Sequence, residues 1–352
     1  MCIRDRKYTG KNIGTFNGEP VTEIELINDL GNSIVFWSLG ARINEFNINP
    51  FGNIVLSYKN IDQLINNRSY YFGATIGRVA GRITNSKFTL NDNDYILDAN
   101  EANNHLHGGK SGYDLRNWSY EIKEYDSEIK LIFSLLDKEK DNYYPGDLEI
   151  KVIHSFNNDN EWTVEYRAHS NKDTIVNPTN HVYFNLNGEK SSVANHYLTI
   201  PATEILETND DSSPNGKRQS VLGTDIDFNK TVRMEKIFES NHPEVLKNKG
   251  LDTIYVLDNT NPIILENPSK NINLEINTDR TCLIVYTLNK INEDSSMDLC
   301  KHQGIALETQ LFPDAINHED FGNIILKKGN EFYSKTVYKV KAKRNENTKE
   351  AK

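Results

Sequence analysis

Apolar side chains recur at every second position in several segments of this chain. Val21–Ile27 and Lys87–Leu90 alternate in this way, and so does Leu148–Phe156. A period of two places alternate side chains on opposite faces of a strand. The polar run Asn157–Asn160 separates Leu148–Phe156 from a second apolar segment, Trp162–Ala168, which is typical of a β-hairpin.

Helical patterns are few, and the strand pattern continues along nearly the whole chain. Only Asn60–Ile65 and Thr231–Phe238 are expected to form short helices, and Asn273–Asn277 with Cys282–Leu288 are expected to form a further strand pair. No Pro-rich or Ser-rich linker divides the chain. The pattern therefore predicts a mostly-β fold, a single large antiparallel β-sandwich.

Composition and charge argue against two classes of binding partner. The 352 residues carry 40 Lys and Arg against 50 Asp and Glu, a formal charge of -10, so we expect no nucleic-acid partner. No run of 18 apolar residues exists, and the N-terminus lacks the apolar core of a signal peptide, so we expect no membrane partner. Three cysteines without metal-like spacing favour a reducing cytoplasm.

Two glycine-rich segments carry candidate functional residues. In Gly73–Ile83, Arg78 and Arg82 share parity and would lie on one face of an extended strand, although two surface arginines are an equally simple interpretation. In Asn103–Gly109, His105 and His107 form a His-x-His pair that a metal site could use. Because no Glu follows within a few residues, we expect no metal, and a plain loop histidine is the alternative.

Three later positions place ionisable side chains beside strands. His181 lies between an Asn-Pro turn and an aromatic strand, where it can transfer a proton or simply be bonded within the core. Glu308 follows apolar residues, so its carboxylate is expected to be partly buried, the alternative being an exposed strand glutamate. Asp252 precedes a strand, and the alternative is that it only caps a turn. Because no nucleophile elbow, reactive thiol or dinucleotide fingerprint is present, these residues favour acid–base chemistry on a neutral, hydroxylated molecule.

Four motifs in this order resemble the aldose 1-epimerase (galactose mutarotase) family. They are Gly77–Ile83, Asn104–Gly109, Thr179–Leu186, and Leu307–Gln310 followed by Pro313–Ala315. The resemblance runs from about Gly14 to about Val340. It implies a β-sandwich domain at residues 14–340, between an N-terminal extension of uncertain order at residues 1–13 and a charged tail at residues 341–352.

The resemblance also implies a reaction, the interconversion of the α and β anomers of a free aldose such as galactose or glucose. Glu308 would be the general base at O1 and His181 the general acid at O5, with Glu308 ionised and His181 protonated at the start. His107 would hydrogen-bond near O5 and could share the acid role. Substrate binding would fall to Arg82, His107, Asp252, Tyr183 and Gly81, and no metal or cofactor would be needed.

Two positions depart from the family pattern. Gly81 stands where Asn is usual, and Ile284 falls where some relatives carry a Gln that contacts substrate. Both departures bear on sugar preference.

The alternative functions are a non-catalytic sugar-binding protein, a hexose-6-phosphate 1-epimerase and a glycoside hydrolase that pairs Asp252 with Glu308. A monomer and a homodimer both remain open.

Overall fold

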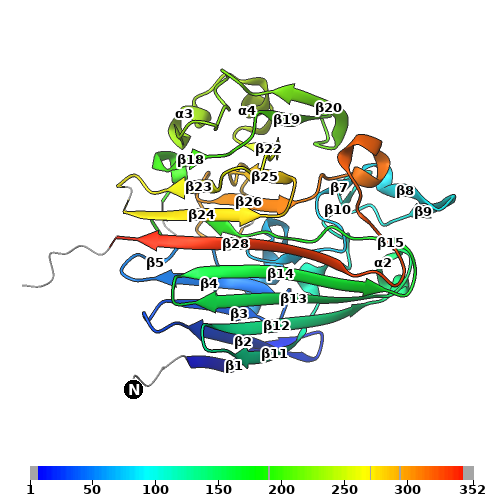
Figure 1. Ribbon diagram of the computed structural model, residues 1–352, viewed down its shortest axis with the longest axis horizontal. Coiled ribbons are helices and arrows are strands. Elements are labelled where there is room, and N and C mark those ends of the chain that lie inside the picture. The colour runs from blue at the N-terminus through cyan, green and yellow to red at the C-terminus, as the bar shows by residue number, and fades with distance from the viewer. Residues whose placement is uncertain (1–6, 189–190, 270, 293–294, 344–352) are drawn as a thin grey trace, which may run out of the picture.

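The computed structural model describes residues 7–188, 191–269, 271–292 and 295–343, and strands dominate it (Figure 1). One large antiparallel sheet has nine strands in the order β11 (Ser119–Glu124), β12 (Glu128–Asp137), β13 (Leu148–Asn157), β14 (Glu161–Ser170), β28 (Phe332–Ala342), β24 (Ile272–Thr278), β23 (Ile263–Glu266), β18 (Tyr197–Thr199), β21 (Val232–Arg233). This sheet faces the viewer in Figure 1.

Two further antiparallel sheets form the second layer. A five-stranded sheet runs β1 (Lys7–Phe16), β2 (Glu19–Ile27), β3 (Ser33–Trp37), β4 (Arg42–Ile48), β5 (Gly52–Asn53). A six-stranded sheet runs β17 (Tyr183–Phe184), β26 (Ile305–Gln310), β25 (Cys282–Tyr286), β22 (Asp252–Val256), β19 (Glu204–Thr208), β20 (Pro214–Ser220). An isolated bridge between Val55 and Phe184 joins the two sheets.

Short ladders and helices complete the described chain. The two-stranded ladders are β6 (Thr75–Ile76) with β16 (Thr179–Asn180), β7 (Arg82–Ile83) with β10 (His105–Leu106), β8 (Lys87–Leu90) with β9 (Asn93–Ile96), and β15 (Thr174–Ile175) with β27 (Ile325–Leu326). The α-helices are α1 (Ile61–Asn66), α2 (Glu139–Asn142), α3 (Met234–Phe238), α4 (Pro243–Asn248).

The main core lies between the two layers. Phe36 of β3 packs against Phe133 of β12 with ring centroids 6.4 Å apart, and Leu307 of β26 joins the same buried cluster as Leu274 of β24. The inward-facing residues of each strand are those at alternate positions, as the period of two requires. The predicted β-sandwich is therefore confirmed.

The local sequence predictions hold better than the pairing predictions. β13 and β14 form the expected hairpin, with Phe156 opposite Trp162, and α1 begins after Asn60, whose side chain accepts a hydrogen bond from the Gln63 amide. The expected pairing of Asn273–Asn277 with Cys282–Leu288 is wrong. β24 pairs with β23 and β28, whereas β25 pairs with β22 and β26 in the other layer. Alternation shows which face of a strand is buried but does not identify its partner.

The ends of the chain extend the sandwich beyond the range expected from the sequence. β1 starts at Lys7, so residues 7–13 form part of a sheet edge, while residues 1–6 lie outside the described residues. β28 continues to Ala342, and residues 344–352 also lie outside the described part. Among the described residues, no helix combines the length and apolar character needed to cross a bilayer.

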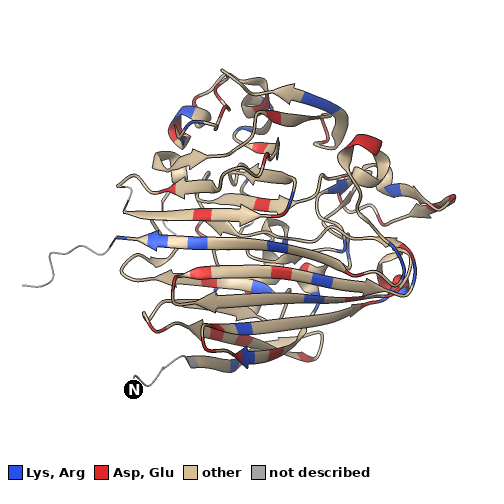
Figure 2. Ribbon diagram, in the orientation of Figure 1, with Lys and Arg blue, Asp and Glu red and all other residues tan. Residues whose placement is uncertain are grey.

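Charges of both signs are interspersed on the face shown in Figure 2. Along β28, Lys339 pairs with Glu161 at 2.8 Å, and Lys341 pairs with Glu275. On β14, Arg167 pairs with Glu331 at 3.1 Å. These three basic residues of the sheet are thus matched by carboxylates.

Candidate active site

One wall of the candidate site is a face of the six-stranded sheet. Antiparallel pairing sets Ile254 opposite Ile284 and Ile284 opposite Glu308, so these three side chains form a row across β22, β25 and β26. Asp252 lies opposite Tyr286 one step along the same face. The sheet therefore presents two carboxylates beside apolar and aromatic side chains.

The other wall is built from short ladders and the turns that follow them. β7 supplies Arg82 and is preceded by Gly81, the turn after β10 supplies His107, and His181 follows β16. Both walls line one pocket with a volume of about 260 Å³. All seven residues expected at the site line this pocket: Gly81, Arg82, His107, His181, Tyr183, Asp252 and Glu308.

Glu308 and His181 form a buried carboxyl–imidazole pair. Glu308 Oε1 lies 3.4 Å from His181 Nε2, and both residues are at most 5% exposed. The other carboxylate oxygen, Glu308 Oε2, has no hydrogen-bond partner among the described residues. It is therefore free to accept a hydrogen bond from a ligand hydroxyl.

Burial shifts the two pKa values in opposite directions. Loss of water raises the pKa of Glu308 to about 8, with the Asp252 charge acting in the same direction and Arg82 against it. Loss of water lowers the pKa of His181 to about 4. Both shifts therefore favour the uncharged forms, a protonated Glu308 and a neutral His181. This differs from the ionised Glu308 and protonated His181 expected from the sequence, because burial penalises an ion pair.

His107 is a hydrogen-bond donor rather than an acid. Its Nδ1 accepts a hydrogen bond from the backbone amide of Gly81 at 3.2 Å, so the proton of the neutral ring lies on Nε2. Burial lowers the pKa of His107 well below its usual range, and the nearby His181 and Arg82 lower it further. His107 lines the pocket, and a neutral imidazole is a poor source of a proton.

Arg82 is held by a carboxylate that the sequence reasoning missed. Its Nε and one terminal nitrogen donate to the two oxygens of Glu101 at 2.6 and 2.8 Å, a bidentate pair that fixes the guanidinium plane. Glu101 stands two residues before the Asn103–Gly109 motif, and no sequence signal links it to Arg82. Asp252 makes no hydrogen bond or ion pair within the described residues, and burial raises its pKa while Arg82 opposes that rise. A guanidinium and an open carboxylate thus face the same cavity.

Aromatic rings enclose the histidines. The Tyr71 ring lies 5.0 Å from His107 and 5.7 Å from His181, and the Tyr183 ring lies 5.1 Å from His181. Tyr71 has a left-handed backbone, with φ of 54°, and it was not expected from the sequence; the aromatic run Tyr70–Phe72 was its only signal. These rings exclude water from the buried pair and strengthen its electrostatics.

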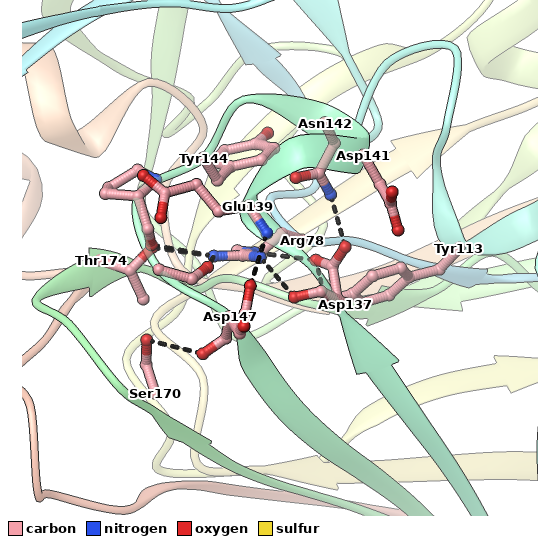
Figure 3. A network of polar contacts seen from close by, with 12 residues as sticks. Arg78, Tyr113, Asp137, Glu139, Asp141, Asn142, Tyr144, Asp147, Ser170 and Thr174 are labelled. Atoms are coloured by element: carbon pink, nitrogen blue, oxygen red, sulfur yellow. Dashed lines mark hydrogen bonds and ion pairs between the residues drawn. The ribbon is translucent and has the colours of Figure 1, made fainter.

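Arg78 does not share a face with Arg82, and the prediction from their parity is wrong. Residues 77–81 are not a strand, and the Arg78 side chain is fully buried away from the pocket. Its Nε donates to Asp137 at 2.8 Å, and Asp137 also accepts from Tyr113 and Asn142 (Figure 3). Arg78 therefore anchors the segment that leads to Gly81 and Arg82 and takes no part in the pocket.

The two histidines of the His-x-His pair lie in different surroundings. His105 turns away from the pocket and bonds to Asp98 and to the Tyr144 hydroxyl, the latter at 2.7 Å. His107, His181 and Glu308 offer ligand atoms within 4.8 Å of one another, a spacing that a cation could use. The same three side chains line the pocket.

The two departures from the family pattern both lie on the pocket wall. Gly81 adopts a φ of 74°, and a Cβ there would lie 2.7 Å from Pro313 Cβ, so the site has no room for a larger residue. Ile284 contributes an apolar side chain beside Glu308 in the strand register. At these two positions the pocket wall is therefore less polar than the family pattern implies, and at Gly81 it carries no side chain.

The sequence and the fold of this chain match those of known proteins. The family model for aldose 1-epimerase matches residues 22–339. The aldose 1-epimerase of Streptococcus thermophilus is 31% identical, with 90% of this chain and 93% of that protein covered; the maltose epimerase of Levilactobacillus brevis is 27% identical, with 89% and 93% covered. The crystal structure of galactose 1-epimerase from Lactobacillus acidophilus NCFM superposes with a TM-score of 0.88 at 26% identity and covers 97% of this chain and all of that one. This chain therefore belongs to the aldose 1-epimerase family, isomerases that act on aldose sugars.

Proposed function

We propose that this enzyme interconverts the α and β anomers of a free aldose, with Glu308 and His181 as its proton-transfer pair. The observation that carries the proposal is the 3.4 Å contact between Glu308 Oε1 and His181 Nε2 inside a pocket that also holds Arg82 and Asp252. Ring opening requires loss of the O1 proton and gain of a proton at O5. A pair that shares one proton can supply both transfers.

The pair must first move its proton from Glu308 to His181. Sugar hydroxyls that donate to the open Oε2 of Glu308 favour the ionised carboxylate and so drive this transfer across the 3.4 Å contact. Glu308 then removes the O1 proton and His181 protonates O5. After rotation about C1–C2, the two groups exchange roles to close the ring. His107 donates its Nε2 hydrogen toward O5 and stabilises the charge that develops there.

Arg82 and Asp252 orient the sugar. The Glu101 contacts fix the Arg82 guanidinium, while Asp252 remains open to accept from ring hydroxyls. The pocket holds three carboxylates, Glu101, Asp252 and Glu308, against Arg82 and Lys290. This balance favours a neutral sugar over a hexose 6-phosphate, whose phosphate would need a cluster of unpaired cations.

Mutarotation of a free sugar tests the proposed function directly. Freshly dissolved α-D-glucose and α-D-galactose are followed by polarimetry with wild type, with His181→Ala, and with His169→Ala, a control at an exposed histidine outside the pocket. We expect wild type and His169→Ala to accelerate mutarotation and His181→Ala to lose at least about 100-fold in kcat/KM. Acceleration by none of the three proteins would refute the proposal, and release of a free sugar from an aryl glycoside would indicate a hydrolase instead.

The partner and compartment that we propose follow from the same residues. A small free aldose suits a pocket of about 260 Å³ lined by hydroxyl, amide and carboxylate groups. Cys282 is buried and Cys300 is exposed, and neither forms a disulfide. Unpaired thiols suit a reducing cytoplasm.

A further inference from the structure

Glu101 lines the pocket beside Arg82, and the proposed proton transfers do not use it. The Glu101 and Arg82 side chains are 37% and 18% exposed, so a ligand in the pocket can approach both charges. We propose that Glu101 is a specificity-determining residue that excludes acidic sugars, such as hexuronates, from the pocket. The inference rests on the proposed interconversion of anomers and deepens it, because it names the residue that limits the substrates to neutral sugars.

The Glu101 carboxylate occupies the edge of the Arg82 guanidinium that suits a carboxylate ligand. Nε and a terminal nitrogen of an arginine form an edge that binds a carboxylate through two parallel hydrogen bonds. In this pocket the two oxygens of Glu101 accept those hydrogen bonds at 2.6 and 2.8 Å. This edge is therefore closed to an acidic sugar, and the Glu101 charge offsets the attraction that the rest of the guanidinium would exert on an anion.

The turn before β10 holds the Glu101 carboxylate in this place. The Glu101 backbone amide donates to the Asn104 carbonyl at 3.2 Å, and the Asn104 amide donates to the Glu101 carbonyl at 2.8 Å. The Asn104 side chain accepts from the Asn85 amide and donates to Asp211. Since β10 pairs with β7, which carries Arg82, the turn returns the carboxylate to the guanidinium. The ion pair is thus a built feature of the pocket wall.

Other carboxylates add to the negative charge around Arg82. Burial acts to lower the pKa of Arg82, but the Glu101 hydrogen bond and the charges of Asp252 and Asp211 outweigh it and raise that pKa. Lys290, the other cation that lines the pocket, is exposed to solvent. An anionic sugar would therefore meet like charges on the Arg82 side of the pocket, which is an effective way to reject it.

Glu101 is the carboxylate of the pocket whose charge can be removed without removing a reacting group. Loss of water raises the pKa of Glu308 to about 8, so Glu308 is mostly neutral in the empty pocket and repels an anion weakly. Burial raises the pKa of Asp252 as well. Glu101, in contrast, lies in an ion pair with Arg82 and is more exposed than Glu308, which is 2% exposed. It is therefore the side chain at which charge selectivity can be tested.

The test compares a neutral hexose with an acidic hexose of the same ring configuration. Glu101→Gln removes the charge, and its carbonyl oxygen can still accept one hydrogen bond from Arg82; Glu101→Asp keeps the charge on a shorter side chain. The matched control is Glu161→Gln, because Glu161 also pairs with a cation, Lys339 at 2.8 Å, and lies outside the pocket. Polarimetry gives kcat/KM for α-D-galactose and for α-D-galacturonate, both freshly dissolved in neutral buffer, with the spontaneous rate subtracted and the melting temperature measured.

We expect kcat/KM of the wild type to be at least about tenfold lower for galacturonate than for galactose. Glu101→Gln should raise kcat/KM for galacturonate by at least about tenfold and lower it for galactose by about threefold, since Arg82 loses one of its two contacts. Glu101→Asp should remain as slow on galacturonate as the wild type, and Glu161→Gln should match the wild type on both sugars.

The opposite signs separate charge selectivity from a merely structural role. A Glu101→Gln enzyme that folds and gains nothing on galacturonate would overturn the inference, and so would a gain of equal size in Glu101→Asp. A wild type equally efficient on both sugars would overturn it without any variant, while leaving the proposed function intact. A wild type inactive on galactose and on every other free sugar would instead overturn the proposed function, and this inference with it.

Discussion

The pH dependence of kcat/KM follows from the two opposite pKa shifts in the Glu308–His181 pair. Below about pH 4 both groups hold a proton and no base remains; above about pH 8 both have lost theirs and no acid remains. The form with one shared proton is therefore the active one. We expect a bell-shaped profile of kcat/KM with limbs near pH 4 and pH 8 and a broad plateau around pH 6.

The size of the effect follows from those limbs. At pH 3 and at pH 9, one pH unit beyond either limb, about one tenth of the free enzyme holds the shared proton. We therefore expect kcat/KM at these two pH values to be about tenfold lower than on the plateau. The assay is polarimetry of α-D-glucose at low buffer concentration, with the spontaneous rate subtracted at every pH. The spontaneous reaction is itself catalysed by acid and base, so a buffer-dilution series is the control.

Two results would refute this reasoning. A kcat/KM that continues to rise beyond pH 9 would show that Glu308 does not control the alkaline limb. A plateau narrower than about two pH units would show that burial does not separate the two pKa values. Exposed Glu and His side chains, with pKa values near the ordinary ones, would give such a narrow plateau. His181→Ala should abolish the acid limb together with most of the activity.

Three further predictions concern stability and metal. Asp137→Ala leaves the fully buried Arg78 guanidinium without its carboxylate, so urea unfolding should show a loss of about 3–5 kcal/mol, and a loss below about 1 kcal/mol would contradict the structural role of this pair. Gly81→Ala should lower stability by about 1–3 kcal/mol in the same assay, because its Cβ would meet Pro313 Cβ at 2.7 Å and φ is 74°; an unchanged midpoint would count against this crowding. Mutarotation should be unchanged by EDTA, since the proposed steps are proton transfers; inhibition reversed by added zinc would assign the His107, His181 and Glu308 atoms to a metal.

The sequence predicted the parts of the fold that depend on neighbouring residues. The hairpin of β13 and β14 and the start of α1 are encoded by local alternation, a polar turn and a capping Asn60. The sequence did not predict that β24 and β25 lie in different sheets, because the short link between them passes from one layer to the other. That step depends on pairing with β28 and β22, which are distant in sequence.

The candidate site shows the same contrast between local sequence patterns and contacts of distant residues. The motifs contain six of the seven expected site residues, and Asp252 stands outside them; all seven line the pocket. The partners of those residues were not predictable in this way. Glu101 reaches Arg82 across a turn, and the Gly81 amide fixes the proton of His107 through a backbone contact. Charge states also depend on burial, because loss of water favours the uncharged forms of Glu308 and His181 over the ionised pair expected from the sequence.

The most direct test of the central claim is polarimetric kcat/KM for Glu308→Gln on freshly dissolved α-D-glucose. Gln keeps the shape of the side chain but cannot take up the O1 proton, so the account predicts a loss of about 10²–10⁴-fold with an unchanged melting temperature. Glu149→Gln, at an exposed position of β13, is the matched control and should equal wild type. A Glu308→Gln enzyme within about tenfold of wild type would contradict the assignment of Glu308 as the base.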